Sequence, residues 1–86
     1  MGNYNGWMNK ETWNIALWIS NDEYLYNSIT ENKYLTYSEF YRDLKHVLLY
    51  GNNQTPDGIS WTHPDLNIAE LNCMIRETWE DVPVTE

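Results

Sequence analysis

The two histidines and the single cysteine are the residues whose side chains most often bind metals or act as nucleophiles. His46 and His63 lie in different predicted elements, and neither stands in the HExxH, CxxC or EF-hand spacings that hold metal ions. Cys73 has no basic neighbour in sequence that would activate it, so we expect a packed small residue rather than a nucleophile. The chain also lacks a glycine-rich phosphate loop and a GxSxG motif. We therefore expect no enzyme activity, no metal site and no cofactor.

Carboxylates are the most abundant charged groups, and they are unevenly distributed. The 86 residues include 13 acidic and 5 basic ones, which gives a net charge of −8. Residues 1–50 hold six acidic and four basic residues, hence −2, whereas residues 51–86 hold seven acidic residues and only Arg76, hence −6. An acidic surface repels a phosphate backbone and cannot gain from counterion release. We therefore expect no direct binding of nucleic acid.

The acidic C-terminal third has two interpretations. It can be a solubilising surface, because any small domain benefits from net charge. It can also be a face that meets lysine and arginine side chains of a basic protein partner. On the second interpretation the predicted partner-binding residues are six carboxylates of this region: Glu70, Glu77, Glu80 and Asp81, with Asp57 and Asp65 nearby.

The first half of the chain predicts two consecutive helices. Asn9 has the side chain of a helix N-cap, and residues 10–20 follow it with helical periodicity. A second cap signature at residues 21–23 predicts a kink or a short turn and a further helix to about residue 29, on which Leu25 and Ile29 face inward. The inward stripe predicted for the first helix comprises Trp13, Ala16, Leu17 and Ser20, with Asn14 and Trp18 beside it.

A third helix is predicted to begin at Tyr37. Thr36 and Glu39 match a capping box, in which each side chain satisfies the other's backbone N–H. Gly51 is placed to end this helix in a left-handed conformation. Residues 51–65 then form a long loop with a tight turn at residues 56–58, held by a packed Trp61. The predicted inward positions of the helix are Tyr37, Phe40, Leu44, Val47 and Leu48.

The last predicted helix begins at Asp65 or Asn67 and ends before Pro83. Its predicted inner stripe comprises Ile68, Leu71, Ile75 and either Thr78 or Trp79. The fold class that follows is mainly α, a small bundle of three to four short helices with an aromatic core and one long irregular loop. Residues 1–86 form one domain, with an N-terminal arm at 1–8 whose Tyr4 and Trp7 pack onto it, the loop at 51–65 and a frayed tail at 82–86.

Aromatic residues are in excess of what such a bundle can bury. The chain has five Trp, seven Tyr and one Phe, and most of them are expected in the core. Surplus tyrosine on a surface is typical of protein interfaces. Stacking on single-stranded nucleic acid is an alternative, but that mechanism normally comes with a positive groove. The tyrosines that do not all fit on inward stripes are Tyr24, Tyr26, Tyr34, Tyr41 and Tyr50.

The compartment follows from what the sequence lacks. A single cysteine can form no internal disulfide, which indicates a reducing environment. No apolar stretch approaches the roughly 18 residues of a membrane span, and the N-terminus has no basic and apolar signal regions. We therefore expect a cytoplasmic protein with no membrane contact.

Residues 6–13, Gly-Trp-Met-Asn-Lys-Glu-Thr-Trp, begin a pattern that continues with Leu17-Trp18, Asn21-Asp22-Glu23 and Tyr26. This pattern resembles a family of small proteins encoded by bacteriophages and other mobile elements, which reads N-G-W-x-N-x-E-T-W, then L-W, then N-D-E and a tyrosine. The resemblance implies a phage or prophage origin and action inside a bacterial host cell. It implies no mechanism. The matched residues also have the character of a helix cap plus a core, so no functional role is transferred to them.

These observations lead to two functional hypotheses. In the first, the chain is a phage accessory protein, of anti-CRISPR or anti-restriction type, whose acidic surface inhibits a host defence protein that handles nucleic acid. In the alternative, it is a homo-oligomeric structural or assembly protein of the phage, with a self-complementary interface of surplus tyrosine and tryptophan. Light scattering separates the two, because a closed assembly larger than a dimer favours the second, whereas a homodimer is compatible with both.

Overall fold

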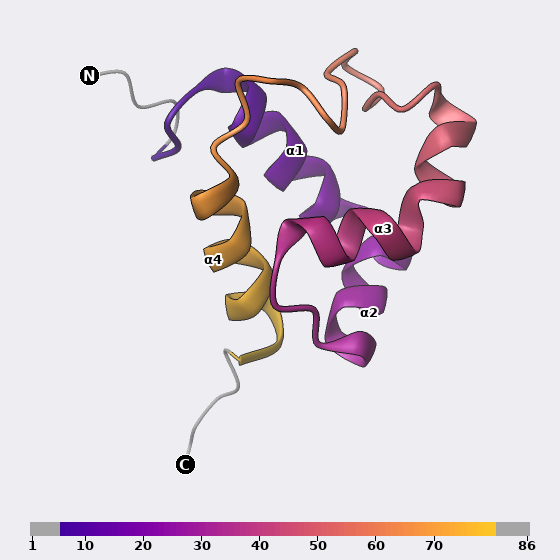
Figure 1. The fold of residues 1–86 in the computed structure, drawn as a ribbon, viewed down its shortest axis with the longest axis vertical. Helices are drawn as coiled ribbons and strands as arrows, with labels where there is room; N and C mark the ends of the chain where they lie inside the picture. The colour runs from indigo at the N-terminus through magenta and orange to yellow at the C-terminus, as the bar shows by residue number, and fades with distance from the viewer. Residues whose placement is uncertain (1–5, 81–86) are drawn as a thin grey trace.

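The computed structural model describes residues 6–80, and these residues fold into a helical bundle joined by one long loop (Figure 1). Mainly α architecture with few short helices is therefore confirmed. The predictions for Tyr4 and for the tail at 82–86 lie outside the described residues. The elements of the described part are α1 (Lys10–Asn21), α2 (Glu23–Asn32), α3 (Tyr37–Leu48), the 3-10 turn η1 (Leu49–Gly51) and α4 (Ile68–Glu80).

Side-chain caps begin the helices where the sequence predicted them. The Asn9 side chain accepts a hydrogen bond from the backbone N–H of Thr12 at 2.9 Å, and α1 begins at the next residue. Asp22 ends α1 and accepts from the N–H of Leu25 at 3.1 Å, which begins α2 and produces the predicted kink. These caps satisfy N–H groups of the first turn that have no partner within the helix.

Helix α3 begins at Tyr37 as predicted, but the hydrogen bond of Glu39 and the way the helix ends differ from the prediction. The Thr36 hydroxyl accepts from the Glu39 N–H at 3.2 Å as expected, but the Glu39 carboxylate accepts from the N–H of Leu35 rather than Thr36. At the other end the chain tightens into η1, and the left-handed residues are Asn52 and Asn53 instead of Gly51. Asparagine tolerates this conformation because its short polar side chain forms local hydrogen bonds.

The inward face of α1 is rotated relative to the predicted stripe. Ile15 and Ile19 are completely buried, whereas Ser20 is exposed and Trp13 and Leu17 are only half-buried. Aliphatic side chains fill the centre of the core, while an indole N–H needs a polar partner and favours its edge. Asn14, predicted beside the inward stripe, is buried, and so is Thr12, which periodicity did not place inward.

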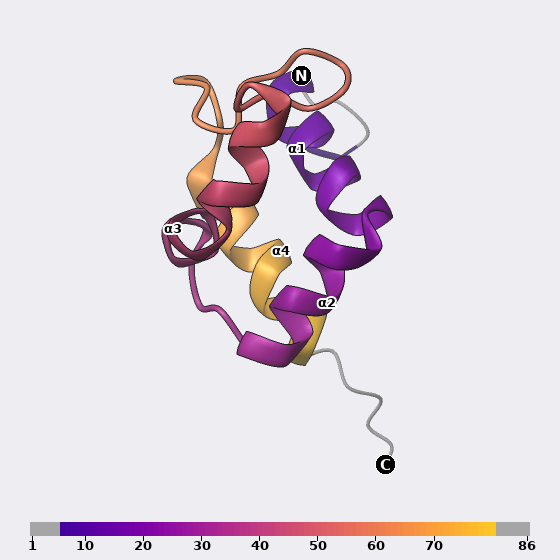
Figure 2. The same ribbon diagram turned by 90° about the vertical axis from the view of Figure 1, so that its right-hand side faces the viewer.

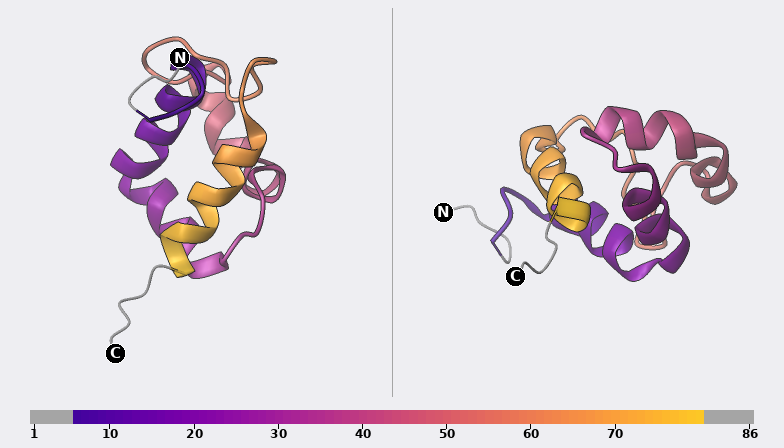
Figure 3. Two further views of the ribbon diagram at one scale, coloured as in Figure 1. Left: turned by 90° about the vertical axis from the view of Figure 1, so that its left-hand side faces the viewer. Right: turned by 90° about the horizontal axis from the view of Figure 1, so that it is seen from below.

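Helix α4 is the central packing element of the bundle, because it contacts α1, α2 and α3. Figures 2 and 3 show α1 and α2 following one another as a bent pair on one side, with α3 on another. An aromatic cluster joins α3 to the segment before it. The ring of Phe40 stacks on the ring of Tyr37, with 5.7 Å between their centroids, and meets the ring of Tyr34 edge-on, with 6.2 Å between their centroids. The predicted aromatic contribution to the core is therefore confirmed.

The loop between η1 and α4 is held to the core by Trp61, as predicted. Its side chain is only 3% exposed, and its backbone carbonyl accepts a 2.6 Å hydrogen bond from the hydroxyl of Tyr37. Burial raises the pKa of that hydroxyl, so it remains a donor. The predicted tight turn is present, because the Gly58 N–H donates to the Thr55 carbonyl at 2.8 Å and Gly58 has a φ of 91°.

Helix α4 begins after Asn67, whose side chain accepts from the N–H of Glu70 at 3.1 Å. Leu71 and Ile75 are completely buried, as predicted for the inner stripe. The prediction was wrong for Ile68, which is exposed on the first turn. Trp79 is half-buried and donates its indole N–H to the Tyr34 carbonyl at 2.8 Å, which joins the end of α4 to the segment before α3.

Candidate functional site

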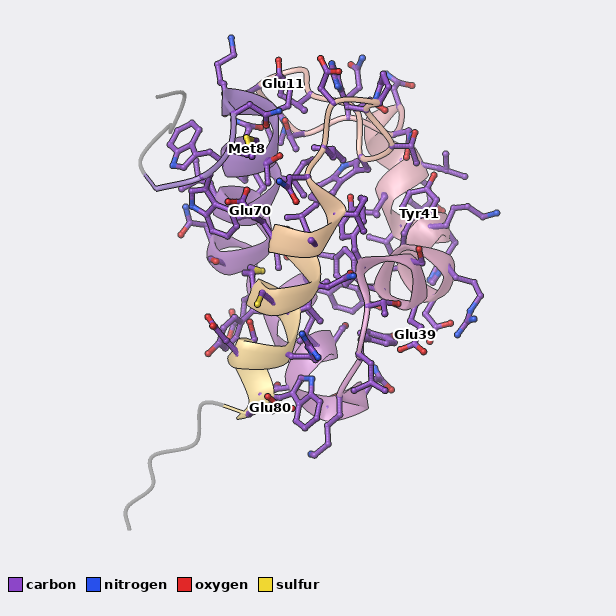
Figure 4. All side chains as sticks on the ribbon, turned by 60° about the vertical axis from the view of Figure 1, so that its left-hand side comes forward. Met8, Glu11, Glu39, Tyr41, Glu70 and Glu80 are labelled. Atoms are coloured by element: carbon purple, nitrogen blue, oxygen red, sulfur yellow. The ribbon has the colours of Figure 1, made fainter. Side chains whose placement is uncertain are left out.

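Helix α4 presents three of the six acidic side chains that the sequence singled out. Glu70 lies near its beginning and Glu80 at its end, on the surface shown in Figure 4. Glu77 and Glu80 are exposed, whereas Glu70 is half-buried. Seven residues span about two helical turns, so Glu70 and Glu77 share one side of the helix. Asp81 follows α4 and lies outside the described residues.

Glu70 also connects the N-terminal arm to α4. One of its carboxylate oxygens accepts a 2.9 Å hydrogen bond from the backbone N–H of Met8 (Figure 4). This contact fixes the direction of the carboxylate and places Trp7 next to the helix. Glu70 therefore has a structural function that its position in the sequence did not reveal.

A groove of about 380 Å³ lies between residues 6–7, the part of the arm that the structure describes here, and α4. Cys73, on the side of α4 opposite the buried Leu71, lines this groove and is exposed. The expectation that Cys73 is a packed residue was therefore wrong, because two residues turn a helix by about 200°. The six side chains of the groove that matter for its chemistry are Trp7, Ala69, Glu70, Cys73, Met74 and Glu77.

Asp57 has a different environment from the carboxylates of α4. Its carboxylate accepts hydrogen bonds from the amide of Asn14 at 2.7 Å and from the indole N–H of Trp18 at 3.0 Å, both on α1. These two donors lower the pKa of Asp57 below its ordinary value. Asp57 therefore attaches the loop to α1, and the structure does not place it in the groove beside α4.

Asp65 is exposed on the approach to α4, and its backbone is held on both sides. The carbonyl of Asp65 accepts from the Asn9 side chain at 2.7 Å, and its N–H donates to Nδ1 of His63 at 3.0 Å. The structure therefore brings Glu70 and Glu77 together, continues the acidic surface to Glu80, and leaves Asp57 apart. Contact of these residues with a partner stays a prediction.

A polar network between α1 and the loop was missed by the sequence reasoning. The Thr12 hydroxyl accepts from the N–H of Asn67 at 2.8 Å, and the Thr55 hydroxyl donates to the side-chain carbonyl of Asn14 at 2.7 Å. In Figure 1 the orange end of the loop passes over the beginning of α1. Polar residues at positions 9, 12 and 14, which alternate with Trp7, Trp13 and Trp18, were the available signal.

Residues 1–81 match a family described as "Family of unknown function (DUF7249)". The chain belongs to DUF7249. No curated protein and no solved structure matches it. Because the matched range contains all four helices seen between residues 6 and 80, DUF7249 membership concerns the whole bundle rather than the N-terminal motif alone.

The charges of this DUF7249 member are largely uncompensated within the described part of the chain. Over residues 6–80 the only ion pair joins neighbouring residues of α3, Arg42 and Asp43, at 3.5 Å. Within the same range, no group of three or more His, Cys, Asp or Glu side chains is arranged to hold a metal ion. None of the helices in this part combines the length and apolar character that crossing a bilayer demands.

The attachment of Asp57 to α1 predicts an acid-sensitive loop. Because the folded-state pKa of Asp57 is below the ordinary value of 3.8, ionised Asp57 stabilises the fold above that value. This stabilisation is lost as the pH falls through the lowered folded-state pKa. We expect NMR titration of the Asp57 carboxyl to give a pKa below 3.8, and the Trp18 indole N–H to shift in parallel.

Trp18→Phe is the matched variant for this titration, since it removes one donor and keeps an aromatic ring. It is expected to move the pKa of Asp57 back towards its ordinary value, while Asp57→Asn abolishes the transition. An identical titration in the wild type and Trp18→Phe would mean that the indole contributes nothing to the carboxylate.

Proposed function

We propose that this DUF7249 member is a non-enzymatic, phage-encoded protein that inhibits a host protein of a CRISPR or restriction system. In this proposal the acidic face of α4, comprising Glu70, Glu77 and Glu80, covers a basic surface with which the host protein binds nucleic acid. The site of action is the cytoplasm of the bacterial host. The phage origin rests on the resemblance of the N-terminal segment, and the inhibition rests on the electrostatics of α4.

The observation that carries the proposal is the uncompensated charge of α4. Glu77 and Glu80 are exposed, and the single ion pair of the described residues involves neither of them. The one basic residue of this helix, Arg76, is exposed as well and leaves α4 with an excess of acidic side chains. Such a surface is available to cations of another protein.

An acidic helix face is suited to compete with nucleic acid. Carboxylates offer lysine and arginine the same kind of charge-assisted hydrogen bond that phosphate oxygens offer. Each exposed charge pair contributes only about 0.2–1 kcal/mol, so several carboxylates have to act together. The same charges would accelerate encounter with a basic surface, and this acceleration weakens as salt is added.

The experiment begins with affinity capture from host lysate to name the partner, followed by binding measurements with two matched variants. Glu77→Gln/Glu80→Gln removes two exposed charges from α4, whereas Glu23→Gln/Glu31→Gln removes two exposed charges from α2. Glu70 is retained because it holds Met8. The α4 variant is expected to raise Kd about two- to thirtyfold and to flatten its dependence on salt.

The α2 variant serves as the control and should bind like the wild type. Equal Kd values for the wild type and the α4 variant would refute an electrostatic mechanism. An equal loss of affinity in both variants would show that net charge matters and that the α4 face does not.

A homo-oligomeric phage protein is the second candidate, and exposed tyrosines favour it. Tyr24 and Tyr26 on α2 are exposed, and Tyr50 in η1 is 91% exposed. Of the other two surplus tyrosines, Tyr34 is buried and Tyr41 is half-buried. Light scattering that gives a closed assembly larger than a dimer would favour this candidate.

A further inference from the structure

The groove between Trp7 and α4 combines an apolar surface with an acidic one. Its apolar part is formed by the Trp7 indole, Ala69 and the sulfur-containing side chains of Cys73 and Met74. Its acidic part is formed by the carboxylates of Glu70 and Glu77. These two residues lie about 10 Å apart along the helix axis, because an α-helix rises about 1.5 Å per residue. At about 380 Å³ the groove has the size of a small binding site.

No cation among residues 6–80 forms an ion pair with the carboxylates of the groove. None of the lining residues is basic, and the ion pair of the described residues lies on α3. Glu70 is already oriented by the Met8 N–H, which reduces the ordering cost of using it in a contact. The groove is therefore complementary to a group that carries positive charge on an apolar, flat body.

Arginine is the protein side chain with this combination. Its guanidinium is planar and weakly hydrated, stacks on aromatic rings and donates two parallel hydrogen bonds to a carboxylate. A lysine ammonium is more strongly hydrated and lacks the flat face that would stack on Trp7. The apolar stem of arginine can also cover Ala69 and Met74.

We infer that this groove receives an arginine side chain of the partner protein, with the guanidinium against Trp7 and a carboxylate of Glu70 or Glu77. The inference rests on the proposed function for the presence of a protein partner. It adds the chemical identity of the group that is bound and the place where it binds.

Cys73 provides a direct test, because it is the only cysteine of the chain and lies exposed in the groove. We would measure alkylation of Cys73 by the uncharged reagent N-ethylmaleimide, with a capped tri-arginine peptide as the probe. The matched control is tri-citrulline, which keeps the shape of the side chain and removes its charge. Saturating tri-arginine is expected to slow alkylation at least fivefold, and tri-citrulline to leave it unchanged.

NMR shifts of the Trp7 indole N–H provide an independent readout at peptide concentrations up to about 10 mM, which covers weak contacts. Glu77→Gln is expected to weaken tri-arginine binding about two- to fivefold, the effect of one exposed charge pair. Glu31→Gln on α2 should leave it unchanged. Equal protection by both peptides, or no saturable shift and no protection by tri-arginine, would overturn the inference.

Glu80 distinguishes this inference from the proposed function, since it belongs to the α4 face and does not line the groove. Glu80→Gln should leave tri-arginine binding intact and still weaken binding of the host protein. Failure of the peptide experiment alone overturns the arginine site. Host binding that is indifferent to the α4 charges, with the peptide result intact, overturns the proposed inhibition.

Discussion

Trp61→Ala is expected to destabilise the fold by about 3–5 kcal/mol, the usual cost of truncating a buried aromatic residue. A chain of this length has a total stability of about 4–13 kcal/mol, so the variant loses a large part of it. The indole of Trp61 is 3% exposed within the core cluster, and the backbone of the same residue receives the Tyr37 hydroxyl. Its removal leaves a cavity beneath the loop.

Urea unfolding followed by circular dichroism measures this loss. Tyr50→Ala is the matched control, because Tyr50 is 91% exposed and its truncation should change stability by less than about 0.5 kcal/mol. Trp61→Phe keeps an aromatic ring and is expected to lose less than half as much as Trp61→Ala. If Trp61→Ala unfolded at the same urea concentration as Tyr50→Ala, the loop would not depend on this residue.

Thr12→Val is expected to destabilise the fold by about 1–3 kcal/mol, although it hardly changes the shape of the side chain. Thr12 is completely buried, and its hydroxyl accepts the Asn67 N–H at 2.8 Å. Valine cannot accept this hydrogen bond, so the N–H at the start of α4 loses its partner. Asn67 also caps α4, and the effect should therefore extend to the first turn of that helix.

Thr12→Ser distinguishes the contribution of the hydroxyl to stability from that of the methyl group. Serine retains the acceptor and should cost only about 1 kcal/mol for the lost apolar contact. Hydrogen exchange at the Asn67 amide gives a local readout: it should accelerate in Thr12→Val beyond any change in global stability, and remain slow in Thr12→Ser. Equal exchange in the two variants would show that the bond contributes little.

The contacts that these variants remove also position α4, whose acidic face is proposed to bind a partner. The hydrogen bonds of Asn9, Thr12 and Asn14 hold the long loop and the start of α4 against α1. Glu70 then holds the chain at Met8 to α4. Residues 8–14 thus support α4 and its groove.

The sequence by itself determined the helices and the charge. Asn9, Asp22 and Thr36 each cap a helix through a bond to a residue three positions ahead, so a local pattern was sufficient to locate α1, α2 and α3. The excess of carboxylates in residues 51–86 is a property of composition, and the position of Glu77 and Glu80 on α4 follows from helical spacing.

Only the tertiary structure decided which way the helices face and that Asp57 lies apart from the carboxylates of α4. Asn14 meets Asp57 across 43 positions, and Met8 meets Glu70 across 62. No local pattern encodes such partners, because helical periodicity gives the spacing of an inward face and leaves its phase to the neighbouring elements. The separate environment of Asp57 follows from its distant contacts with α1, whereas the rotated face of α1 and the exposure of Cys73 follow from how the helices pack against one another.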